Sequence, residues 1–226
     1  MNWEDECYLL SKRKFRENAS ILNVFSKKKG KISGIVYGGN SRKIRNYLQL
    51  SNKLFIVNNS KNENKLGYFK TELIKPISPL YFDDKKRTSA LTSLCSILNI
   101  LLPEAQPNKE IYQSYEDFIR SINLENWIIL YIFFELSLLK NLGYDPDLIK
   151  FKTNNPDTLS FKKIKIDNFN YEIPEFLINK SIPKNIDNFL IKKSLNFTRS
   201  IIQNRFFLPN NLSLPKSRVF LENYFS

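Results

Sequence analysis

The chain has 226 residues, of which 42% are hydrophobic and 14% are aromatic, so it can bury a substantial core and is not a disordered chain. Its formal net charge is +13, which favours a polyanionic partner. It contains no histidine and only two cysteines, which excludes Ser–His and Cys–His catalysis, a disulfide framework and a four-cysteine zinc site. Cys7 and Cys95 lie in apolar stretches, so we expect buried free thiols in a reducing compartment.

The positive charge is concentrated in the first third of the chain. Residues 1–80 carry 16 Lys or Arg and 6 Asp or Glu, a net charge of +10, whereas residues 81–226 carry 19 and 16, a net charge of +3. A lysine excess that came from codon bias alone would be spread evenly. The distribution therefore favours a nucleic-acid partner for the N-terminal region.

The N-terminal sequence carries no targeting signal that we recognise. The segment MNWEDECYLL is acidic and lacks the basic start of a signal peptide. The longest apolar run, residues 127–134, is too short to cross a bilayer. We expect a cytoplasmic, nucleoid-associated protein without a membrane partner.

Residues up to 75 have the pattern of short β-strands. Segments rich in Ile, Val, Phe and Tyr alternate with turn signals such as KKKGK and NNSKNEN. Five such strands in this length favour a small closed or nearly closed barrel of the OB type. The predicted strands cover residues 7–11, 19–26, 31–37, 53–58 and 66–75.

A change of period follows Pro76 and Pro79, which end the last strand and form a plausible linker. Beyond them apolar residues recur at helical spacing, so the sequence predicts an α+β protein with an OB-fold domain at 1–78 and an α-helical domain at 79–226. The predicted helices cover residues 87–102, 110–123, 125–142 and 186–207, and short strands are expected near 160–167. Glu135 is the one acid inside the apolar third helix, and we expect a structural partner for it.

The segment GGNSRKIRNYLQ, residues 38–49, has the composition of a phosphate-binding loop. A Walker A loop requires GxxxxGK[ST], and a dinucleotide fingerprint requires GxGxxG at the start of a helix. Neither spacing is present, so a nucleotide-binding enzyme is excluded on this evidence. Taken alone, the loop is equally compatible with contacts to a nucleic-acid backbone and with a solvated basic hairpin.

Two further basic clusters flank strands of the same predicted barrel, one at residues 12–16 and one at residues 27–31. A positive groove with stacking aromatic residues is the general design for holding single strands, and among the interleaved aromatics Tyr37 and Tyr47 are the best candidates. The predicted DNA-binding residues are Lys12, Arg13, Lys14, Arg16, Lys27, Lys28, Lys29, Lys31, Tyr37, Arg42, Lys43, Arg45 and Tyr47.

Clustered carboxylates occur at residues 4–6, at 83–84, and at Asp145 and Asp147. Two-metal nucleases need carboxylates that converge on the metal ions. Asp83 and Asp84 precede a predicted helix, where aspartate caps the first turn, and Asp145 and Asp147 lie in a predicted turn. We therefore expect structural roles, with no metal, no cofactor and no catalytic residue.

Five segments in order make the chain similar to the RecO family of bacterial recombination mediators, in its alphaproteobacterial form. Together these segments extend over nearly the whole length of the chain. The matching segments are residues 3–49, with the basic GGNSRKIRNYLQ loop; ENKLGYFKTEL; residues 87–119; FELSLLKNLGYDPDL; and TRSIIQNRFFLPNNLSLPKSR.

The resemblance implies an N-terminal OB barrel and a C-terminal helical domain. It implies a DNA repair protein that binds single- and double-stranded DNA, anneals complementary strands and forms a complex with RecR. It also implies binding of the acidic C-terminal tail of the single-stranded DNA-binding protein, SSB, so that the recombinase RecA is loaded onto SSB-coated DNA.

The chain departs from the family pattern at two places. Many members carry cysteines after the FEL…LGY helix and some bind zinc there, whereas DLIKFKTNNPDTLSF has none, which predicts a zinc-less domain. Many also carry Arg directly before the aromatic-Glu-Leu motif, where this chain has Ile132 and Phe133. The charge for the SSB tail would then come from elsewhere, and the candidate tail-binding residues are Arg87, Leu136, Leu139, Arg199 and Arg205.

Two other functions remain open at this point. An OB-type RNA-binding or ribosome-associated protein would show the same basic barrel, and it is the main alternative. A metal-dependent nuclease would need the carboxylates above to converge, and we do not expect cleavage.

Overall fold

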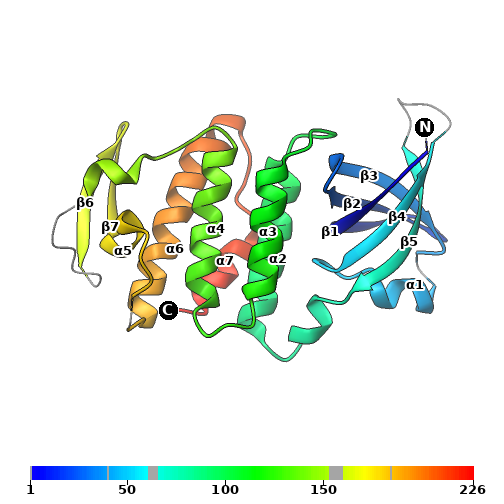
Figure 1. Ribbon diagram of the computed structural model, residues 1–226, viewed down its shortest axis with the longest axis horizontal. Coiled ribbons are helices and arrows are strands. Elements are labelled where there is room, and N and C mark those ends of the chain that lie inside the picture. Colours follow the sequence, from blue (N-terminus) through cyan, green and yellow to red (C-terminus); the bar gives the residue numbers. More distant parts are fainter. Residues whose placement is uncertain (1, 40, 61–65, 153–159, 184) are drawn as a thin grey trace. The chain divides into compact units, whose positions relative to one another are not determined.

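The computed structural model describes residues 2–39, 41–60, 66–152, 160–183 and 185–226. Contacts divide the chain into two compact units (Figure 1). Unit 1 comprises Met1–Tyr112 and Pro215–Arg218, and unit 2 comprises Gln113–Leu214 and Val219–Ser226. Within the described ranges, no helix has the length and apolar character that a membrane crossing requires.

Unit 1 begins with a closed barrel in the strand order β1-β2-β3-β5-β4. Neighbouring strands are antiparallel except β3 and β5, which run parallel where Gly34 pairs with Gly67. Five strands in this arrangement form an OB-type barrel, which confirms the predicted fold of the N-terminal region. The strands are β1 (Trp3–Arg16), β2 (Ala19–Ser26), β3 (Gly30–Tyr37), β4 (Lys53–Asn59) and β5 (Gly67–Lys75).

Strand β1 is longer at both ends than the sequence pattern predicted. Its first half pairs with β4, from Trp3 to Tyr8, and its second half pairs with β2, from Cys7 to Arg16. A strand that closes a barrel in this way forms hydrogen bonds with two neighbouring strands. Its charged ends, WEDE and KRKFR, concealed the alternation that marks a half-buried strand.

The barrel interior is filled by the inward residues of all five strands. Gly34 of β3 is one of these positions, because a Cβ atom there would lie 2.4 Å from the ring of Phe69. The buried cluster consists of Cys7, Leu9, Leu22, Val24, Val36, Leu48, Leu54, Ile56 and Phe69. Both cysteines of the chain are buried free thiols, as expected.

A short helix, α1 (Arg42–Tyr47), lies between β3 and β4 where the sequence predicted only a loop (Figure 1). Ile44 and Tyr47 pack against the barrel core, and Leu48 belongs to it. The Tyr47 hydroxyl donates to the backbone oxygen of Thr71 at 2.8 Å. Apolar residues at i, i+3 and i+4 therefore hold α1 on the barrel, but six residues are too few for a clear periodic signal.

Helix α2 (Lys85–Leu101) follows the short η1 turn (Ser78–Tyr81) and packs on the barrel. The Cys95 thiol donates to the backbone oxygen of Leu9 at 3.5 Å, and the Asn23 amide donates to Asn99 at 2.7 Å. Contacts thus place α2 in the same unit as the barrel. The sequence predicted a domain boundary between residues 78 and 79. Whether residues 1–78 fold on their own is a separate question, so that boundary stays a prediction.

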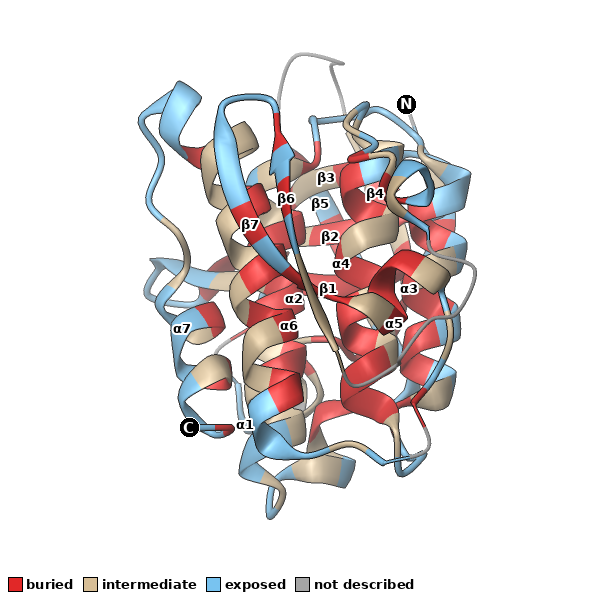
Figure 2. Ribbon diagram, turned by 90° about the vertical axis from the view of Figure 1, so that its left-hand side faces the viewer, coloured by how far each residue is buried: buried red, intermediate tan, exposed pale blue. Residues whose placement is uncertain are grey.

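Unit 2 is largely helical, and α4 (Trp127–Asn141) is buried along most of its length (Figure 2). Glu135 of α4 is fully buried and accepts hydrogen bonds from Tyr131 at 2.8 Å and Thr198 at 2.5 Å, which confirms the expected structural partner. The other helices that contribute are α3 (Lys109–Ser121), which begins in unit 1, α6 (Asn188–Ile202), η3 (Gln203–Phe207), η4 (Leu208–Asn210) and α7 (Lys216–Asn223).

A two-stranded sheet lies between α4 and α6 in the sequence. The predicted strand near residues 160–167 is β6 (Phe161–Ile166), and it pairs with β7 (Phe169–Pro174), which the sequence did not reveal. The short η2 (Leu148–Phe151) precedes the sheet and α5 (Glu175–Asn179) follows it. Ile164, Tyr171 and Ile173 are buried, so one face of the sheet packs against the helices of unit 2.

Candidate nucleic-acid interface

Gly38 and Gly39, which follow β3, are fixed to the β1–β2 end of the barrel by two hydrogen bonds. The backbone N–H of Gly38 donates to the Asn18 oxygen at 2.7 Å, and the Lys12 ammonium donates to the Gly39 oxygen at 3.0 Å. Gly38 has a φ of 67°, which a side chain would disfavour. Two of the three predicted basic segments are therefore joined into one surface.

This surface carries an excess of exposed cations. Arg13, Lys14 and Arg16 on β1 are exposed, as are Arg42 and Arg45 on α1. Burial and the neighbouring Arg45 guanidinium lower the pKa of Lys12, so Lys12 of β1 has a cation of α1 as its neighbour. The Lys43 side chain, also predicted to bind DNA, lies outside the part of the chain that the structure describes.

The third basic segment, Lys27–Lys29, is at the opposite end of β2. Strand register pairs Ala19 with Tyr37 at one end of β2 and Ser26 with Gly30 at the other, a separation of roughly 24 Å at 3.4 Å per residue. Buried Asp5 holds this turn, because its carboxylate accepts from the Lys28 backbone N–H at 2.8 Å. The sequence analysis assigned all three basic segments to one DNA-binding site, but they do not lie together at one end of the barrel.

Two of the predicted residues are used inside unit 1. Lys31 is 8% exposed, and its ammonium donates to the Asn99 oxygen at 2.9 Å and lies 3.4 Å from the Glu104 carboxylate. Tyr47 is half-buried with its hydroxyl on Thr71. Because their polar groups are already engaged within the fold, we leave both out of the candidate interface.

Aromatic residues lie beside the basic surface, and only one of them was predicted. Tyr37, at the end of β3, is exposed and stacks on exposed Tyr68 of β5. Exposed Phe15 lies under the guanidinium of Arg16. The sequence did not single out Tyr68 because its position on the outer face depends on the β3–β5 pairing, which is not local.

The clustered carboxylates make local contacts. Asp84 caps α2 by accepting from the Arg87 backbone N–H at 2.9 Å, as expected. Asp145 accepts from the Asp147 backbone N–H, which lowers the pKa of Asp145, and it pairs with Lys140 at 3.2 Å. Among the described residues, His, Cys, Asp and Glu nowhere form a group of three or more that could hold a metal ion.

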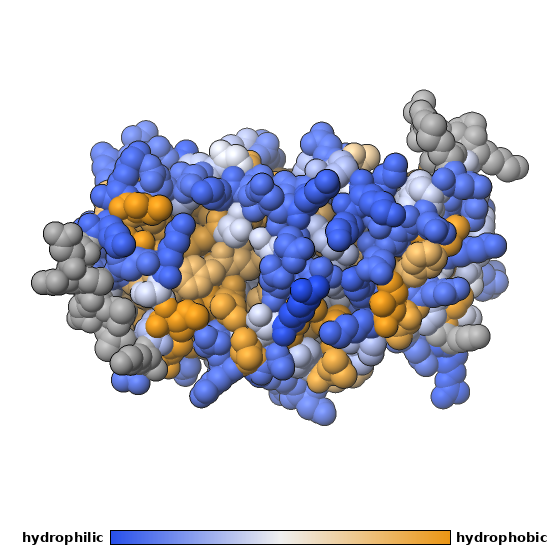
Figure 3. Space-filling view, in the orientation of Figure 1, coloured by the Kyte–Doolittle hydropathy of each residue, from blue (hydrophilic) through white to orange (hydrophobic). Residues whose placement is uncertain are grey.

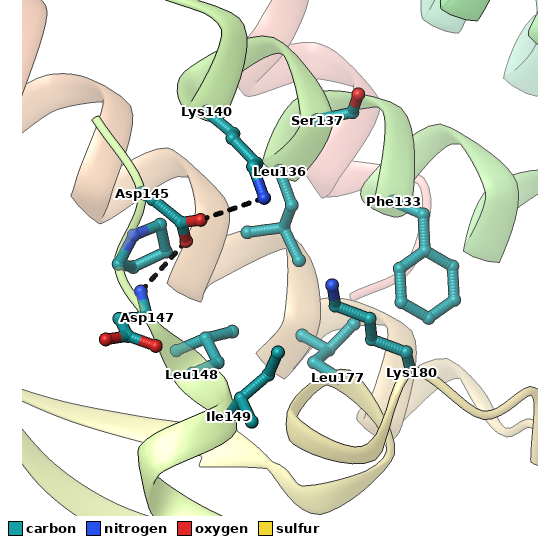
Figure 4. A pocket seen from close by; sticks show the side chains of 11 residues that line it. Phe133, Leu136, Ser137, Lys140, Asp145, Asp147, Leu148, Ile149, Leu177 and Lys180 are labelled. Carbon is teal, nitrogen blue, oxygen red and sulfur yellow. Dashed lines mark hydrogen bonds and ion pairs between the residues drawn. The ribbon is translucent and has the colours of Figure 1, made fainter. Parts of the chain in front are cut away.

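Unit 2 has a cavity of about 250 Å³ between α4, the loop after it and α5 (Figure 4). Its walls are largely apolar. On the face of the molecule that Figure 3 shows, hydrophobic patches lie among hydrophilic side chains. Lys140 and Lys180 stand at the cavity, and the Lys180 ammonium points toward it (Figure 4). The apolar lining residues are Phe133, Leu136, Pro146, Leu148, Ile149 and Leu177.

Only Leu136 of the predicted partner-binding residues lines this cavity. Leu139 is fully buried in the core, so it is not accessible to a partner. The three arginines have acidic partners of their own: Arg87 pairs with Asp84 at 2.5 Å, Arg199 with Glu222 at 2.9 Å, and Arg205 with Asp167 while also lying over the Tyr144 ring. Sequence reasoning did not single out Lys140, in the last turn of α4, or Lys180, which follows α5, although both line the cavity.

Comparison with known proteins places this fold in a family. A model described as "Recombination protein O N terminal" matches residues 1–77, and one described as "Recombination protein O C terminal" matches residues 83–157. The chain belongs to the RecO family. Proteins named DNA repair protein RecO from Wolbachia sp. subsp. Drosophila simulans (strain wRi) and Ehrlichia chaffeensis are 34% identical over 152 residues and 33% identical over 157 residues.

These alignments cover 66% and 69% of the chain but 62% and 64% of the two RecO relatives, so the chain spans less than two thirds of their length. The match to the N-terminal family model ends at residue 77, and the match to the C-terminal family model begins at residue 83. The contacts, in contrast, place α2 in the same unit as the barrel. The cavity beside α4 lies next to the FEL motif by which the sequence resembles RecO, and Phe133 lines it at the position where many members carry arginine.

Proposed function

We propose that the chain is a non-catalytic recombination mediator in DNA repair. It binds single- and double-stranded DNA through the barrel of unit 1, anneals complementary strands and, with RecR, helps to load RecA onto SSB-coated DNA. Membership of the RecO family supports this proposal at the level of DNA repair and recombination. The annealing and loading steps are what the family resemblance implies.

The observation that carries the proposal is the joined basic surface at one end of the barrel. The β1–β2 end and the α1 loop are linked through Lys12 and Gly39. The first presents exposed Arg13, Lys14 and Arg16, and the second presents exposed Arg42 and Arg45. Such cations displace counterions from phosphates and give affinity with little dependence on base sequence. Their charge also reduces the repulsion between two DNA strands, which favours annealing.

The salt dependence of DNA affinity tests this surface. Each phosphate contact on a single strand contributes a slope of about −0.7 in log affinity against log salt. The Arg42→Ala, Arg45→Ala double variant should therefore reduce the slope by roughly 1.4. The Lys27→Ala, Lys29→Ala double variant is a control that removes the same charge at the far end of β2. With an oligonucleotide too short to span β2, it should change the slope less.

An unchanged slope in the Arg42, Arg45 variant would remove α1 from the DNA site. Competition between single-stranded DNA and RNA of equal length addresses the RNA-binding alternative. We expect no strong preference for RNA, and a strong one would favour the ribosome-associated function instead.

For the SSB tail we propose the cavity beside α4. An acidic tail that ends in an aromatic residue needs an apolar pocket with cations at its edge. Leu136 and Leu177 supply apolar walls, and Lys140 and Lys180 supply the charge. The side chains of Lys140 and Asp145 are 62% and 51% exposed. Exposed ion pairs contribute little to stability, so Lys140 can exchange Asp145 for a carboxylate of the ligand.

A peptide titration tests this assignment. The SSB tail peptide should bind the full chain, and removal of its terminal Phe should abolish binding. Lys180→Ala should weaken binding, whereas Lys163→Ala, an exposed lysine of β6 outside the cavity, should not. Equal binding with and without the terminal Phe would exclude the cavity as the tail site.

A further inference from the structure

Two exposed tyrosines stack on each other at the basic end of the barrel. The rings of Tyr37 and Tyr68 are 5.2 Å apart between centroids and inclined by 20°. The residues are 56% and 43% exposed, so the pair leaves broad apolar surface in contact with water. Aromatic side chains usually bury such surface, and an open stacked pair is therefore a candidate binding surface.

Strand pairing fixes this arrangement. Parallel β3 and β5 place Tyr68 opposite Ile35, and Tyr37 follows two residues later on the same side of β3. The side chain of Tyr68 raises the pKa of Tyr37, although nearby Arg16 opposes this effect. A tyrosine with an ordinary or raised pKa is uncharged at neutral pH, which suits contact with a polyanion.

A cation and a third aromatic ring adjoin the pair. Arg16 pairs with Ala19, which in turn pairs with Tyr37 across the sheet. The Arg16 guanidinium lies 5.1 Å from the centroid of the Phe15 ring, and Phe15 is 43% exposed. Arg16 thus lies next to the Phe15 ring and near Tyr37.

We propose that Tyr37, Tyr68 and Phe15 form a stacking platform for unpaired bases, with Arg16 holding the adjacent phosphate. This inference rests on the proposed DNA binding by the barrel and adds a preference for the unpaired form of the strand. In a duplex the faces of the bases are covered by their neighbours, whereas an unpaired base can stack on a side chain. The basic surface then binds both single-stranded and double-stranded DNA, and the platform adds affinity only for the single strand.

The platform also bears on annealing. A strand whose bases lie on exposed rings keeps its pairing edges free, because stacking uses only the faces of the bases. A complementary strand can then pair with it while the phosphates of both are neutralised by the cations of β1 and α1. The bases leave the platform as they become part of the duplex.

The test measures the affinity of the full chain for three probes at one salt concentration. These are a labelled oligothymidine, an abasic oligonucleotide of equal length and a duplex. Wild-type protein should prefer oligothymidine to the abasic strand. Tyr37→Thr and Tyr68→Thr, which keep strand propensity, should each weaken oligothymidine binding roughly ten-fold and leave the other two affinities nearly unchanged.

Tyr37→Phe and Tyr68→Phe serve as controls, because they keep the ring and should bind oligothymidine like wild type. If a threonine variant unfolds, Phe15→Ser offers an independent removal of one ring. Equal affinities of wild type for oligothymidine and the abasic strand, or equal losses on all three probes, would overturn the platform while leaving DNA binding intact. Absence of binding to every probe would overturn the proposed function as well.

Discussion

The Lys12 ammonium donates to the Gly39 carbonyl at 3.0 Å, and this bond joins strand β1 to the loop before α1. Because Lys12 also lies near Arg45, the two cations should contribute to DNA binding as a unit. We predict that Lys12→Met and Arg45→Ala are non-additive in a double-mutant cycle, with a coupling of about 0.5–3 kcal/mol in binding free energy.

The matched control pairs Lys12→Met with Lys29→Ala at the other end of β2. These sites share no partner, so their effects should add within about 0.5 kcal/mol. Additive effects in the Lys12–Arg45 cycle would show that the loop is not held by Lys12 in the DNA-bound protein.

The Tyr68 side chain beside Tyr37 predicts a pH dependence. It raises the pKa of Tyr37, so its contribution to stability is present below the unfolded pKa of tyrosine and is lost as the pH rises through the folded value. Tyr68→Phe should move the Tyr37 titration toward the ordinary tyrosine pKa. Tyrosinate absorbance, compared with a Tyr37→Phe baseline, measures the shift, and an unmoved titration would contradict an effect of the Tyr68 hydroxyl on Tyr37.

The Asp84 cap at the start of α2 predicts a local loss of stability. Asp84→Ala should lower the free energy of unfolding by about 1 kcal/mol, and Asp83→Ala, which is exposed and next to it, serves as the control. Although burial opposes it, hydrogen bonds from Arg87 lower the pKa of Asp84. The stabilisation is therefore present above the unfolded pKa and disappears as the pH falls through the folded value.

Buried Glu135 should matter for folding rather than for chemistry. Glu135→Ala removes the acceptor of Tyr131 and Thr198 and leaves a cavity, so we predict a loss of roughly 3 kcal/mol in unfolding free energy. Glu125→Ala, at an exposed position, should change it by less than about 0.5 kcal/mol. Denaturant unfolding measures both, and equal effects would contradict the buried network.

The barrel should depend on α2 for stability. Cys95 and Asn99 of α2 bond to Leu9 and Asn23 of the barrel, so a fragment of residues 1–78 would expose the apolar surface that α2 covers. We predict that this fragment gives a broad, non-cooperative thermal transition, whereas a fragment of residues 1–112 unfolds cooperatively. Cooperative unfolding of residues 1–78 would support a domain boundary at residue 78.

Local patterns predicted those parts of the fold in which neighbours in sequence decide the structure. Runs of β-branched and aromatic residues between turn signals placed strands β2, β3, β4 and β5 within one residue at each end, and the long helices follow from their apolar periodicity. Helix α1 has only one and a half turns, so its apolar residues gave no periodic signal. The same holds for the partner strand β7, whose pairing with β6 depends on a turn.

The site residues were harder to predict, because charge is visible in a sequence but the use of that charge is not. From the sequence, Lys31 and Arg42 are equally good candidates for binding a phosphate. In the structure the Lys31 ammonium donates to the Asn99 oxygen within unit 1. Tyr68 lies beside Tyr37 because β3 and β5 pair in parallel. Such assignments depend on contacts between residues that are distant in the sequence.

The most direct test of the central claim is photo-crosslinking of a single-stranded oligonucleotide to the full chain, with the modified peptides identified by mass spectrometry. The surface formed by β1, the loop after β3 and α1 predicts crosslinks concentrated in residues 12–18 and 37–47, with Tyr68 as a further site. Crosslinks confined to Lys27–Lys29 or to unit 2 would contradict it.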